Sequence, residues 1–250
     1  MRLKDRTALV TGSTSGIGEA VAEALAREGA HVVVSGRDRD RGERVVAAIR
    51  AAGGRADFIA ADLHDAASAL GLGEEATDVL GGRIDILVNN AGTTRTPSAT
   101  GAVSESDFDR LYALNVKAPF FLTGVIGEAM ARRGTGAVIN IGSTVAKFGF
   151  AGSALYGSTK AALEKLTQDW AAEYGPRGVR VNSVSPGPTH TPLTARIGDR
   201  DTLKAMTDGT PANRPAEPSE VADAVVFLAS DEARYIHGAR LPLDGGRSAV

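Results

Sequence analysis

The stretch TALVTGSTSGIGEAVAEALAREGA, residues 7–30, decides the fold class of this chain of 250 residues. It joins a short apolar run typical of a buried strand (7–11), a loop with Gly12, Gly16 and Gly18, and a segment with helical spacing of its apolar residues. Glycines there let the backbone turn tightly and approach a pyrophosphate, and the helix behind them presents unpaired N–H groups. The spacing G-x-x-x-G-x-G differs from the commoner G-x-G-x-x-G. Its place between a strand and a helix still favours a dinucleotide-binding loop over a plain turn.

Strand-like and helical patterns alternate along the rest of the chain. Strand-like segments recur at 31–36, 56–62, 84–92, 136–143, 179–187 and 239–246, and helical patterns at 41–54, 105–133, 154–174 and 218–230. Such alternation predicts right-handed βαβ units, a parallel sheet and an α/β fold. We expect a single domain over 1–250. The proline-containing segment at about 188–217 is expected to be a substrate loop rather than a domain boundary.

Composition and charge exclude several classes of function. A net charge of −2 gives no general attraction to nucleic acid or to an anionic membrane. The chain has no cysteine, and its four histidines show no metal spacing, so we expect no disulfide, no thiolate chemistry and no metal site. There is no run of about 18 apolar residues and no signal-like start, which predicts a cytoplasmic protein. Neither a Walker loop nor a G-x-S-x-G elbow occurs.

The end of the second predicted strand, VSGRD (34–38), bears on the choice of cofactor. An acidic residue at this point holds the ribose hydroxyls of NAD and repels the 2′-phosphate of NADP. This chain has Gly36 in its place, and the fork of Arg37 can pair with a phosphate. The pattern favours NADP(H), with NAD(H) as the alternative. Asp38 could oppose a phosphate, and Arg37 could instead be a solvated charge at an exposed helix start.

A tyrosine and a lysine in YGSTK (156–160) lie one helical turn apart, as Tyr156 and Lys160. Reduction of a ketone needs a hydride at carbon and a proton at oxygen. We expect the Lys160 ammonium to lower the pKa of Tyr156 from about 10, so that the phenol serves as acid and base. Ser143, at a strand end, can donate to a carbonyl oxygen, although a turn cap is its alternative. Asn115 lies in an apolar helical stretch and needs hydrogen-bond partners.

Taken together, these motifs resemble those of the short-chain dehydrogenase/reductase family, which includes 3-oxoacyl-[acyl-carrier-protein] reductases. The resemblance runs from about Leu3 to Gly246, through TGSTSGIG (11–18), AADL (60–63), NNAG (89–92), LNV (114–116), GS (142–143), YGSTK (156–160), SPGPTHT (185–191) and DGG (244–246). It implies a Rossmann-type doubly wound sheet of about seven mostly parallel strands in the order 3-2-1-4-5-6-7, with helices on both faces. The family is usually tetrameric or dimeric, which implies a homotetramer or a homodimer built through the long helices.

The resemblance also implies roles for the four candidate catalytic residues. Tyr156 would be the acid/base, and Ser143 would polarise the carbonyl. Lys160 would bind the nicotinamide ribose and tune the phenol. Asn115 would hold a water molecule that links Lys160 to solvent, with an asparagine satisfied locally in a bent helix as the alternative.

The cofactor-binding set that the residues and the resemblance give is larger. It comprises Gly12, Ser13, Ser15, Gly16, Ile17, Gly18, Ser35, Arg37, Asp62, Leu63, Asn89, Ala91, Gly92, Tyr156, Lys160, Pro186, Gly187, Thr189 and Thr191. Asp62 is expected to accept a hydrogen bond from the adenine amine, with a helix N-cap as an equal alternative. Asn89 is expected to brace neighbouring strands more than to touch substrate. Thr189 and Thr191 would bind the carboxamide of the nicotinamide.

Substrate-facing residues are expected in three segments with a mostly apolar lining. The candidates are Arg95, Val145, Phe148, Phe150, His190 and Leu193. Arg95 would either meet a carboxylate or phosphate or point to water. The leading hypothesis is an NADP(H)-dependent oxidoreductase of small carbonyl or secondary alcohol substrates. A 3-oxoacyl-[acyl-carrier-protein] reductase, with acyl carrier protein as partner, is the second, and a non-catalytic NADP-binding sensor is the third.

Overall fold

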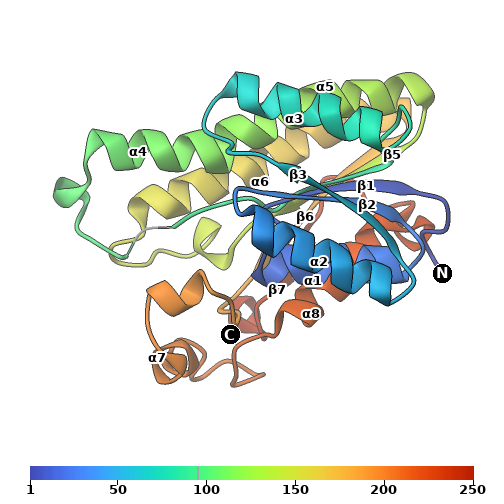
Figure 1. Ribbon diagram of the computed structural model, residues 1–250. Coiled ribbons are helices and arrows are strands. Elements are labelled where there is room, and N and C mark those ends of the chain that lie inside the picture. The colour runs from blue at the N-terminus through green and yellow to red at the C-terminus, as the bar shows by residue number, and fades with distance from the viewer. Residues whose placement is uncertain (95) are drawn as a thin grey trace.

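The computed structural model describes residues 1–94 and 96–250, and seven strands within these residues form one sheet (Figure 1). The strands are β1 (Thr7–Thr11), β2 (His31–Gly36), β3 (Arg55–Ala60), β4 (Ile86–Asn89), β5 (Gly136–Ile141), β6 (Val179–Pro186) and β7 (Arg240–Leu243). Their order is β3-β2-β1-β4-β5-β6-β7, and every neighbouring pair is parallel. The predicted fold class and strand order are confirmed, with a wholly parallel sheet in the described chain.

Helices cover both faces of this sheet (Figure 1). One face carries α1 (Gly16–Arg27), α2 (Arg39–Ala51) and α8 (Pro218–Ala229), and the other carries α3 (Ala66–Val79), α5 (Ala118–Arg133) and α6 (Ala154–Tyr174). The remaining helices are α4 (Glu105–Tyr112), the π-helical segment Ala113–Lys117 that joins it to α5, and the short α7 (Arg200–Ala205). Short 3₁₀ turns lie at Thr100–Ala102, Thr144–Ala146, Gly175–Arg177, Thr194–Arg196, Asp231–Ala233 and Arg247–Ala249. Within the described residues, no helix has the length and apolar character needed to cross a membrane.

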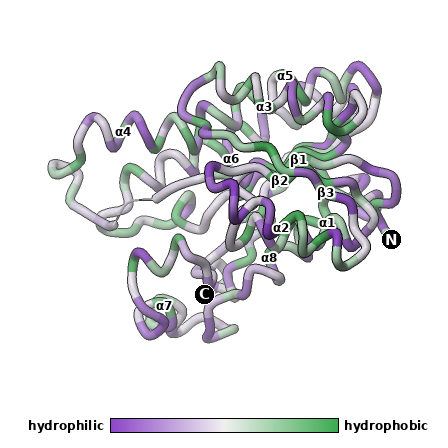
Figure 2. The backbone as a smooth tube through the Cα atoms, viewed as in Figure 1, coloured by the Kyte–Doolittle hydropathy of each residue, from purple (hydrophilic) through white to green (hydrophobic). Residues whose placement is uncertain are grey.

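The side chains of β1 show why the strand must lie between two layers of helices. Ala8 and Val10 pack into the core under α1 and α8, while Leu9 packs into the core on the opposite face. All three are fully buried. A strand that is buried on both faces has a continuous apolar sequence rather than an alternating one. Figure 2 shows the resulting concentration of hydrophobic residues along the strands between the helix layers.

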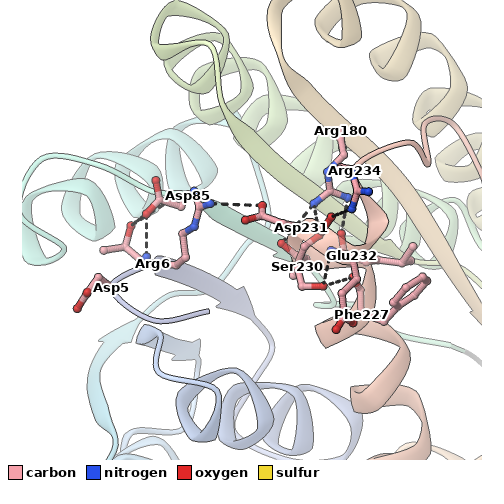
Figure 3. Close-up of polar contacts among 12 residues, drawn as sticks. Asp5, Arg6, Asp85, Arg180, Phe227, Ser230, Asp231, Glu232 and Arg234 are labelled. Carbon is pink, nitrogen blue, oxygen red and sulfur yellow. Dashed lines mark hydrogen bonds and ion pairs between the residues drawn. The ribbon is translucent and has the colours of Figure 1, made fainter. Parts of the chain in front are cut away.

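Polar contacts close the edge of the sheet where the strands begin (Figure 3). Asp85, just before β4, accepts a hydrogen bond of 3.0 Å from the backbone N–H of Thr7. Arg180 on β6 donates to the carbonyl oxygens of Leu228, Ala229 and Ser230. These carbonyls lie at the C-terminal end of α8. Each unpaired carbonyl at a helix end needs such a donor. The polar groups named here are therefore hydrogen-bonded within the chain itself. The loops that follow the strands lie at the opposite edge of the sheet.

The segment 188–217 is tied at its two ends. Thr189 and Ala216 form an isolated parallel bridge. The N–H of His190 donates to the carbonyl of Ala216, and the N–H of Ala216 donates to the carbonyl of Pro188, both at 2.9 Å. These contacts form a narrow neck, and α7 lies in the loop beyond it.

Candidate functional site

A cleft of about 610 Å³ runs along the edge of the sheet where the strands end. In the sheet, β2 and β3 lie on one side of β1, and β4 and the strands after it lie on the other side. Ligands of open α/β sheets bind at such a switch point. The loops that follow β2 and β3 line one end of the cleft, here called the Arg37 end. The residues that follow β5 and the first turns of α6 line the other, here called the Tyr156 end.

Most of the residues predicted from the sequence line this cleft. Those that do are Gly12, Ser15, Gly16, Ile17, Gly18, Ser35, Arg37, Asp62, Leu63, Ala91, Gly92, Ser143, Val145, Phe150, Tyr156, Lys160, Pro186, Gly187, Thr189, Thr191 and Leu193. Arg95 lies outside the described residues. The fold thus brings the loops that follow six strands, β1 to β6, into one concave surface.

The glycine loop can hold a pyrophosphate. Gly12 has a φ of +63°, and a Cβ there would lie 2.7 Å from the Cα of Ala91. A Cβ on Gly18 would lie 2.4 Å from the carbonyl oxygen of Gly12. Ser15, the N-cap of α1, makes no side-chain capping hydrogen bond. The loop is therefore packed closely against its surroundings, and the N-terminus of α1 faces the cleft, which fits the phosphates of a dinucleotide.

A steric contact at the Arg37 end explains why residue 36 is a glycine. A Cβ on Gly36 would lie 2.7 Å from Cγ2 of Thr14, closer than real Cβ atoms approach. Thr14 belongs to the glycine loop and also lines the cleft. An acidic side chain at residue 36, of the kind that holds the ribose of NAD, therefore has no room beside this threonine.

Two arginines and two aspartates share the Arg37 end. Arg37 is 75% exposed, and its Nε lies 3.9 Å from a carboxylate oxygen of Asp62. Asp38 caps α2 by accepting from the backbone N–H of Arg41, whose side chain also donates to it at 2.6 Å. These hydrogen bonds lower the pKa of Asp38. Asp38 is thus engaged with its own helix. The N-cap alternative for Asp62 is wrong, because Asp65 caps α3.

Three polar side chains meet at the Tyr156 end. Tyr156 and Lys160 lie one turn apart on α6, and Ser143 follows β5 after Gly142. The hydroxyl of Ser143 accepts a hydrogen bond of 3.4 Å from the N–H of Val145 as a turn cap, and it also acts on the pKa of the Tyr156 phenol. Lys160 is 5% exposed, and its Nζ donates to the carbonyl oxygen of Ile141 at 2.8 Å. The same Nζ lies 6.0 Å from the centre of the Tyr156 ring.

The pKa values of these two groups move in opposite directions. Burial raises the pKa of Tyr156 above its ordinary value, and the hydroxyl of Ser143 opposes this. Burial lowers the pKa of Lys160 to about 8, and the carboxylate of Glu164 opposes this. The expectation that Lys160 lowers the pKa of the phenol is wrong for this geometry. The Lys160 ammonium donates to the carbonyl of Ile141 on β5, and the loss of water around the Tyr156 ring has the largest effect on the pKa of the phenol.

Asn115 lies behind the cleft in the π-helical segment and is 1% exposed. Its Oδ1 accepts from the N–H of Thr93, and its Nδ2 donates to the carbonyl of Thr93 and to Oγ1 of Thr159. A Cβ on Gly92 would lie 3.4 Å from this Oδ1 and 3.5 Å from Nζ of Lys160. The side chain therefore fixes the loop after β4 beside Lys160. Single π-helical turns of this kind are frequent at functional sites.

Two residues predicted to bind the cofactor lie beneath the cleft instead. Ser13 is fully buried, donates to the carbonyl of Val10 and accepts from the N–H of Ser35, so it joins β1 to β2. Asn89 is 3% exposed and donates to Asn140 and to a threonine of α5. Neither side chain therefore lines the cleft, and Asn89 braces neighbouring strands as expected. Each sits within a motif of small polar residues, and its side chain points back into the sheet.

Two of the predicted substrate-facing residues also lie outside the lining. The ring of His190 is 3.9 Å from Glu217, at the neck of the 188–217 segment. The ring of Phe148 packs against the ammonium of Lys147, 5.7 Å from the ring centre. The backbone directions of the two segments, which the sequence does not give, turn these rings away from the cleft.

Sequence reasoning also missed several lining residues. Thr14 and Arg41 line the Arg37 end, and the guanidinium of Arg247 lies 5.7 Å from the ring centre of Phe150 toward the other end. Asn90 donates to the carbonyls of Thr11 and Gly12 and so holds the glycine loop. The alternating charges of RDRDR (37–41) are a sequence signal that could have identified Arg41.

Comparisons with known proteins agree with this arrangement. A family model described as enoyl-(acyl carrier protein) reductase matches residues 12–248. The 2,5-dichloro-2,5-cyclohexadiene-1,4-diol dehydrogenase LinX of Sphingobium indicum is 40% identical over 99% of this chain and 98% of its own. The 3-oxoacyl-[acyl-carrier-protein] reductase FabG of Thermotoga maritima is 33% identical over 98% of this chain and 99% of its own.

A solved structure extends the agreement to three dimensions. It is described as an NAD(P)-dependent gluconate 5-dehydrogenase of Beutenbergia cavernae with NADP bound at low occupancy. Its TM-score is 0.94 and its identity 38%, over 99% of this chain and 98% of that one. The fold, the cleft and these relatives agree: the chain belongs to the short-chain dehydrogenase/reductase family of NAD(P)-dependent oxidoreductases.

Proposed function

We propose that the chain transfers a hydride between NADP(H) and a small carbonyl or secondary alcohol substrate. The observation that carries the proposal is the meeting of Ser143, Tyr156 and Lys160 at one end of a cleft whose other walls include the glycine loop. The proposed unit is the whole chain, 1–250, as one dinucleotide-binding domain in the cytoplasm, with 188–217 as its substrate loop.

The chain's own part in the reaction is the proton. When bound, a nicotinamide cofactor supplies or accepts the hydride. In the direction of reduction, Tyr156 donates its phenolic proton to the carbonyl oxygen, and Ser143 donates a hydrogen bond to the same oxygen. The raised pKa of Tyr156 keeps the phenol protonated at neutral pH, which suits an acid. Lys160 holds the ribose hydroxyls, and Asn115 beside it completes a proton path to solvent.

The preference for NADP(H) rests on the Arg37 end. Gly36 has no room for an acid, and Arg37 and Arg41 both line the cleft there. Arginine forks pair well with a phosphate. Asp62 would accept a hydrogen bond from the adenine amine, and the nicotinamide carboxamide would meet Thr189 and Thr191. NAD(H) is the alternative, because Asp62 and Asp38 offset part of the positive charge.

A second candidate function is reduction of 3-oxoacyl groups on acyl carrier protein. The relative from Thermotoga maritima carries that name. This candidate requires activity on an acyl thioester, so inertness toward an acetoacetyl thioester would count heavily against it. A homotetramer or homodimer is proposed for either function, through α4, α5 and α6, and size-exclusion chromatography with light scattering tests it.

Substitution of Tyr156 by phenylalanine tests the leading proposal. We expect kcat for ketone reduction to fall by about 10²–10⁴-fold, because the proton donor is removed, while the Kd for NADPH changes by less than about twofold. Tyr112→Phe is the matched control, since Tyr112 bonds only the surface hydroxyl of Ser158 among the described residues. Stopped-flow absorbance of the nicotinamide and titration calorimetry give the two quantities. Undiminished turnover in Tyr156→Phe would overturn the assignment, and binding without any turnover in the native protein would favour a sensor.

A further inference from the structure

A buried ion pair lies directly behind the Tyr156 end of the cleft. Glu164 is on α6, one turn after Lys160, and Arg240 is on β7. Nε of Arg240 lies 2.8 Å from Oε1 of Glu164, and Oγ of Ser185 on β6 donates to the same oxygen at 2.7 Å. The side chains of Glu164 and Arg240 are 16% and 22% exposed, so the pair is mostly out of water.

This pair touches the backbone that carries the candidate catalytic groups. A Cβ on Gly142, the residue before Ser143, would lie 3.1 Å from Oε1 of Glu164 and 2.7 Å from Oγ of Ser185. Nζ of Lys160 donates to Ile141, the residue before that glycine. Two successive turns of α6 thus place an ammonium and a carboxylate against the same end of β5.

We propose that Glu164 and Arg240 are a positioning pair for Lys160. The carboxylate holds Lys160 in its ammonium form, and Arg240 limits the strength of that effect. The proposal rests on the proposed function, in which the charged form of Lys160 is the active one.

The charges around Lys160 account for this role. Side chains four apart on a helix are neighbours, and a carboxylate favours the charged form of a nearby amine, more so where water is excluded. Among the described residues, the titratable and charged groups that face Lys160 or Glu164 are Tyr156 on α6 and Arg240 on β7. The groups that face them from β5, β6 and the π-helical segment are uncharged: Ile141, Gly142, Ser185 and Asn115. Glu164 is the one cause that raises the pKa of Lys160 against its burial.

The hydrogen bonding of Arg240 also differs from that of a purely structural arginine. Arg180, on the neighbouring strand, directs its guanidinium at the carbonyls that end α8. In contrast, Nη2 of Arg240 is buried without a hydrogen-bond partner in the described chain, and so is Oγ of Ser183, its neighbour in register. A buried pair adds little net stability, because desolvation offsets the attraction. Stability alone therefore gives a poor account of an arginine in this place.

Direct titration of Lys160 tests the proposal. Lys160 is the one buried lysine of the described residues, so NMR of the full-length protein with ¹³Cε-labelled lysine can follow its pKa. We expect Glu164→Gln to lower that pKa by roughly one unit and Arg240→Met to raise it by roughly half a unit. Glu128→Gln and Arg180→Met are the controls, because each removes a charge that has other partners. Neither control is expected to move the pKa of Lys160.

The outcomes separate an electrostatic role from a structural one. Opposite shifts in Glu164→Gln and Arg240→Met support the proposal. Unchanged values, or shifts in the same direction, overturn it. If either single variant fails to fold, Glu164→Gln/Arg240→Met removes both charges, and its Lys160 pKa should lie between those expected for the native protein and Glu164→Gln; an unchanged value overturns the proposal.

A kinetic readout links the pair to the reaction. The alkaline limb of kcat/KM for ketone reduction should move in the same direction as the Lys160 pKa in each variant. If the native protein reduces no ketone, the proposed function fails while the titration still decides the role of the pair. If it does reduce ketones and the titration does not move, the pair alone fails.

Discussion

The two ends of the cleft differ in how far they are removed from water. At the Tyr156 end, Lys160 is 5% exposed, and Asn115 behind it is 1% exposed. At the Arg37 end, the side chains of Arg37 and Asp62 are 75% and 64% exposed. Water and salt screen interactions between exposed charges, whereas buried ones keep most of their strength. The same kind of substitution should therefore change the chemistry strongly at one end and modestly at the other.

Lys160 should give the largest effect in this comparison. We expect Lys160→Met to lower kcat/KM for reduction by about 10²–10³-fold, because the variant lacks the cation that we propose to hold the ribose. The pKa of about 8 means that the native ammonium is populated below pH 8 and lost above it. Native kcat/KM should therefore fall about tenfold per pH unit above about 8, and the variant should lack this step.

Lys165→Met is the matched control, since Lys165 is exposed on the next turn and pairs with Asp169. Its pH profile should match that of the native protein. A native profile that stays flat up to pH 10 would contradict the role given to Lys160.

Asn115 should give the next largest effect. Two of its three hydrogen bonds hold Thr93 in the loop after β4 and the third joins Thr159 on α6, so Asn115→Ala leaves half-buried polar groups of Thr93 without these partners. We expect a loss of about 2–4 kcal/mol in the free energy of unfolding and a fall of roughly tenfold or more in kcat. Urea unfolding and steady-state kinetics give the two values.

Asn182→Ala separates the two roles of such an asparagine. Asn182 is buried on β6 and hydrogen-bonds Ile236 and Ala239, at the end of the sheet away from the cleft. It should lose stability with kcat unchanged at 25 °C. Equal losses of kcat in both variants would mean that Asn115 acts through stability alone.

Gly36 tests whether geometry or charge sets the choice of cofactor. We expect Gly36→Asp to lower kcat/KM for NADPH by about tenfold and to gain little with NADH, because its Cβ would meet Thr14. In Thr14→Ala/Gly36→Asp, the side chain at position 14 keeps only its Cβ. That atom would lie 3.5 Å from the Cβ at position 36, which is an ordinary contact. The double variant should use NADH better than Gly36→Asp does. Efficient use of NADH by Gly36→Asp alone would refute the steric argument.

Arg37 should give the smallest effect. Because its side chain is largely exposed, we expect Arg37→Ala to raise the KM for NADPH by only about three- to fivefold, with little change for NADH. The difference should shrink as salt is raised from about 0.05 to 0.5 M. Arg39→Ala, an exposed arginine paired with Glu43 outside the lining, is the control. A preference for NADH in the native protein would show that Arg37 is a surface charge.

Local periodicity was enough to predict the sheet. The predicted bounds of β1 and β2 match the structure. Each of the other strands overlaps its predicted segment, and most strand ends differ from the prediction by about two residues or fewer. Parallel strands that are buried on both faces have continuous apolar sequences, so a local pattern is enough to identify them. The predicted helix over 105–133 appears as α4, a π-helical turn and α5, and Asn115 in that turn takes its partners from outside the helix.

Side-chain direction was the part that the sequence could not supply. Ser13 and Asn89 lie inside the right motifs, yet point away from the cleft. The contact of Thr14 with Gly36 and the pair of Glu164 with Arg240 join residues 22 and 76 positions apart. Such contacts depend on the packing of separate elements, which no local pattern encodes.

The neck at Thr189 and Ala216 has a consequence for how this architecture can diversify. Because the ends of the 188–217 segment are fixed by the bridge and its two hydrogen bonds, the chain beyond them is a closed loop. The entropic cost of closing a loop rises only with the logarithm of its length. Insertions and deletions between the neck and the contact of Ala212 with Gly245 are therefore expected to disturb the sheet little. If the segment is the substrate loop, as proposed, its length and sequence can vary and change the substrate range while the residues beneath it keep their positions.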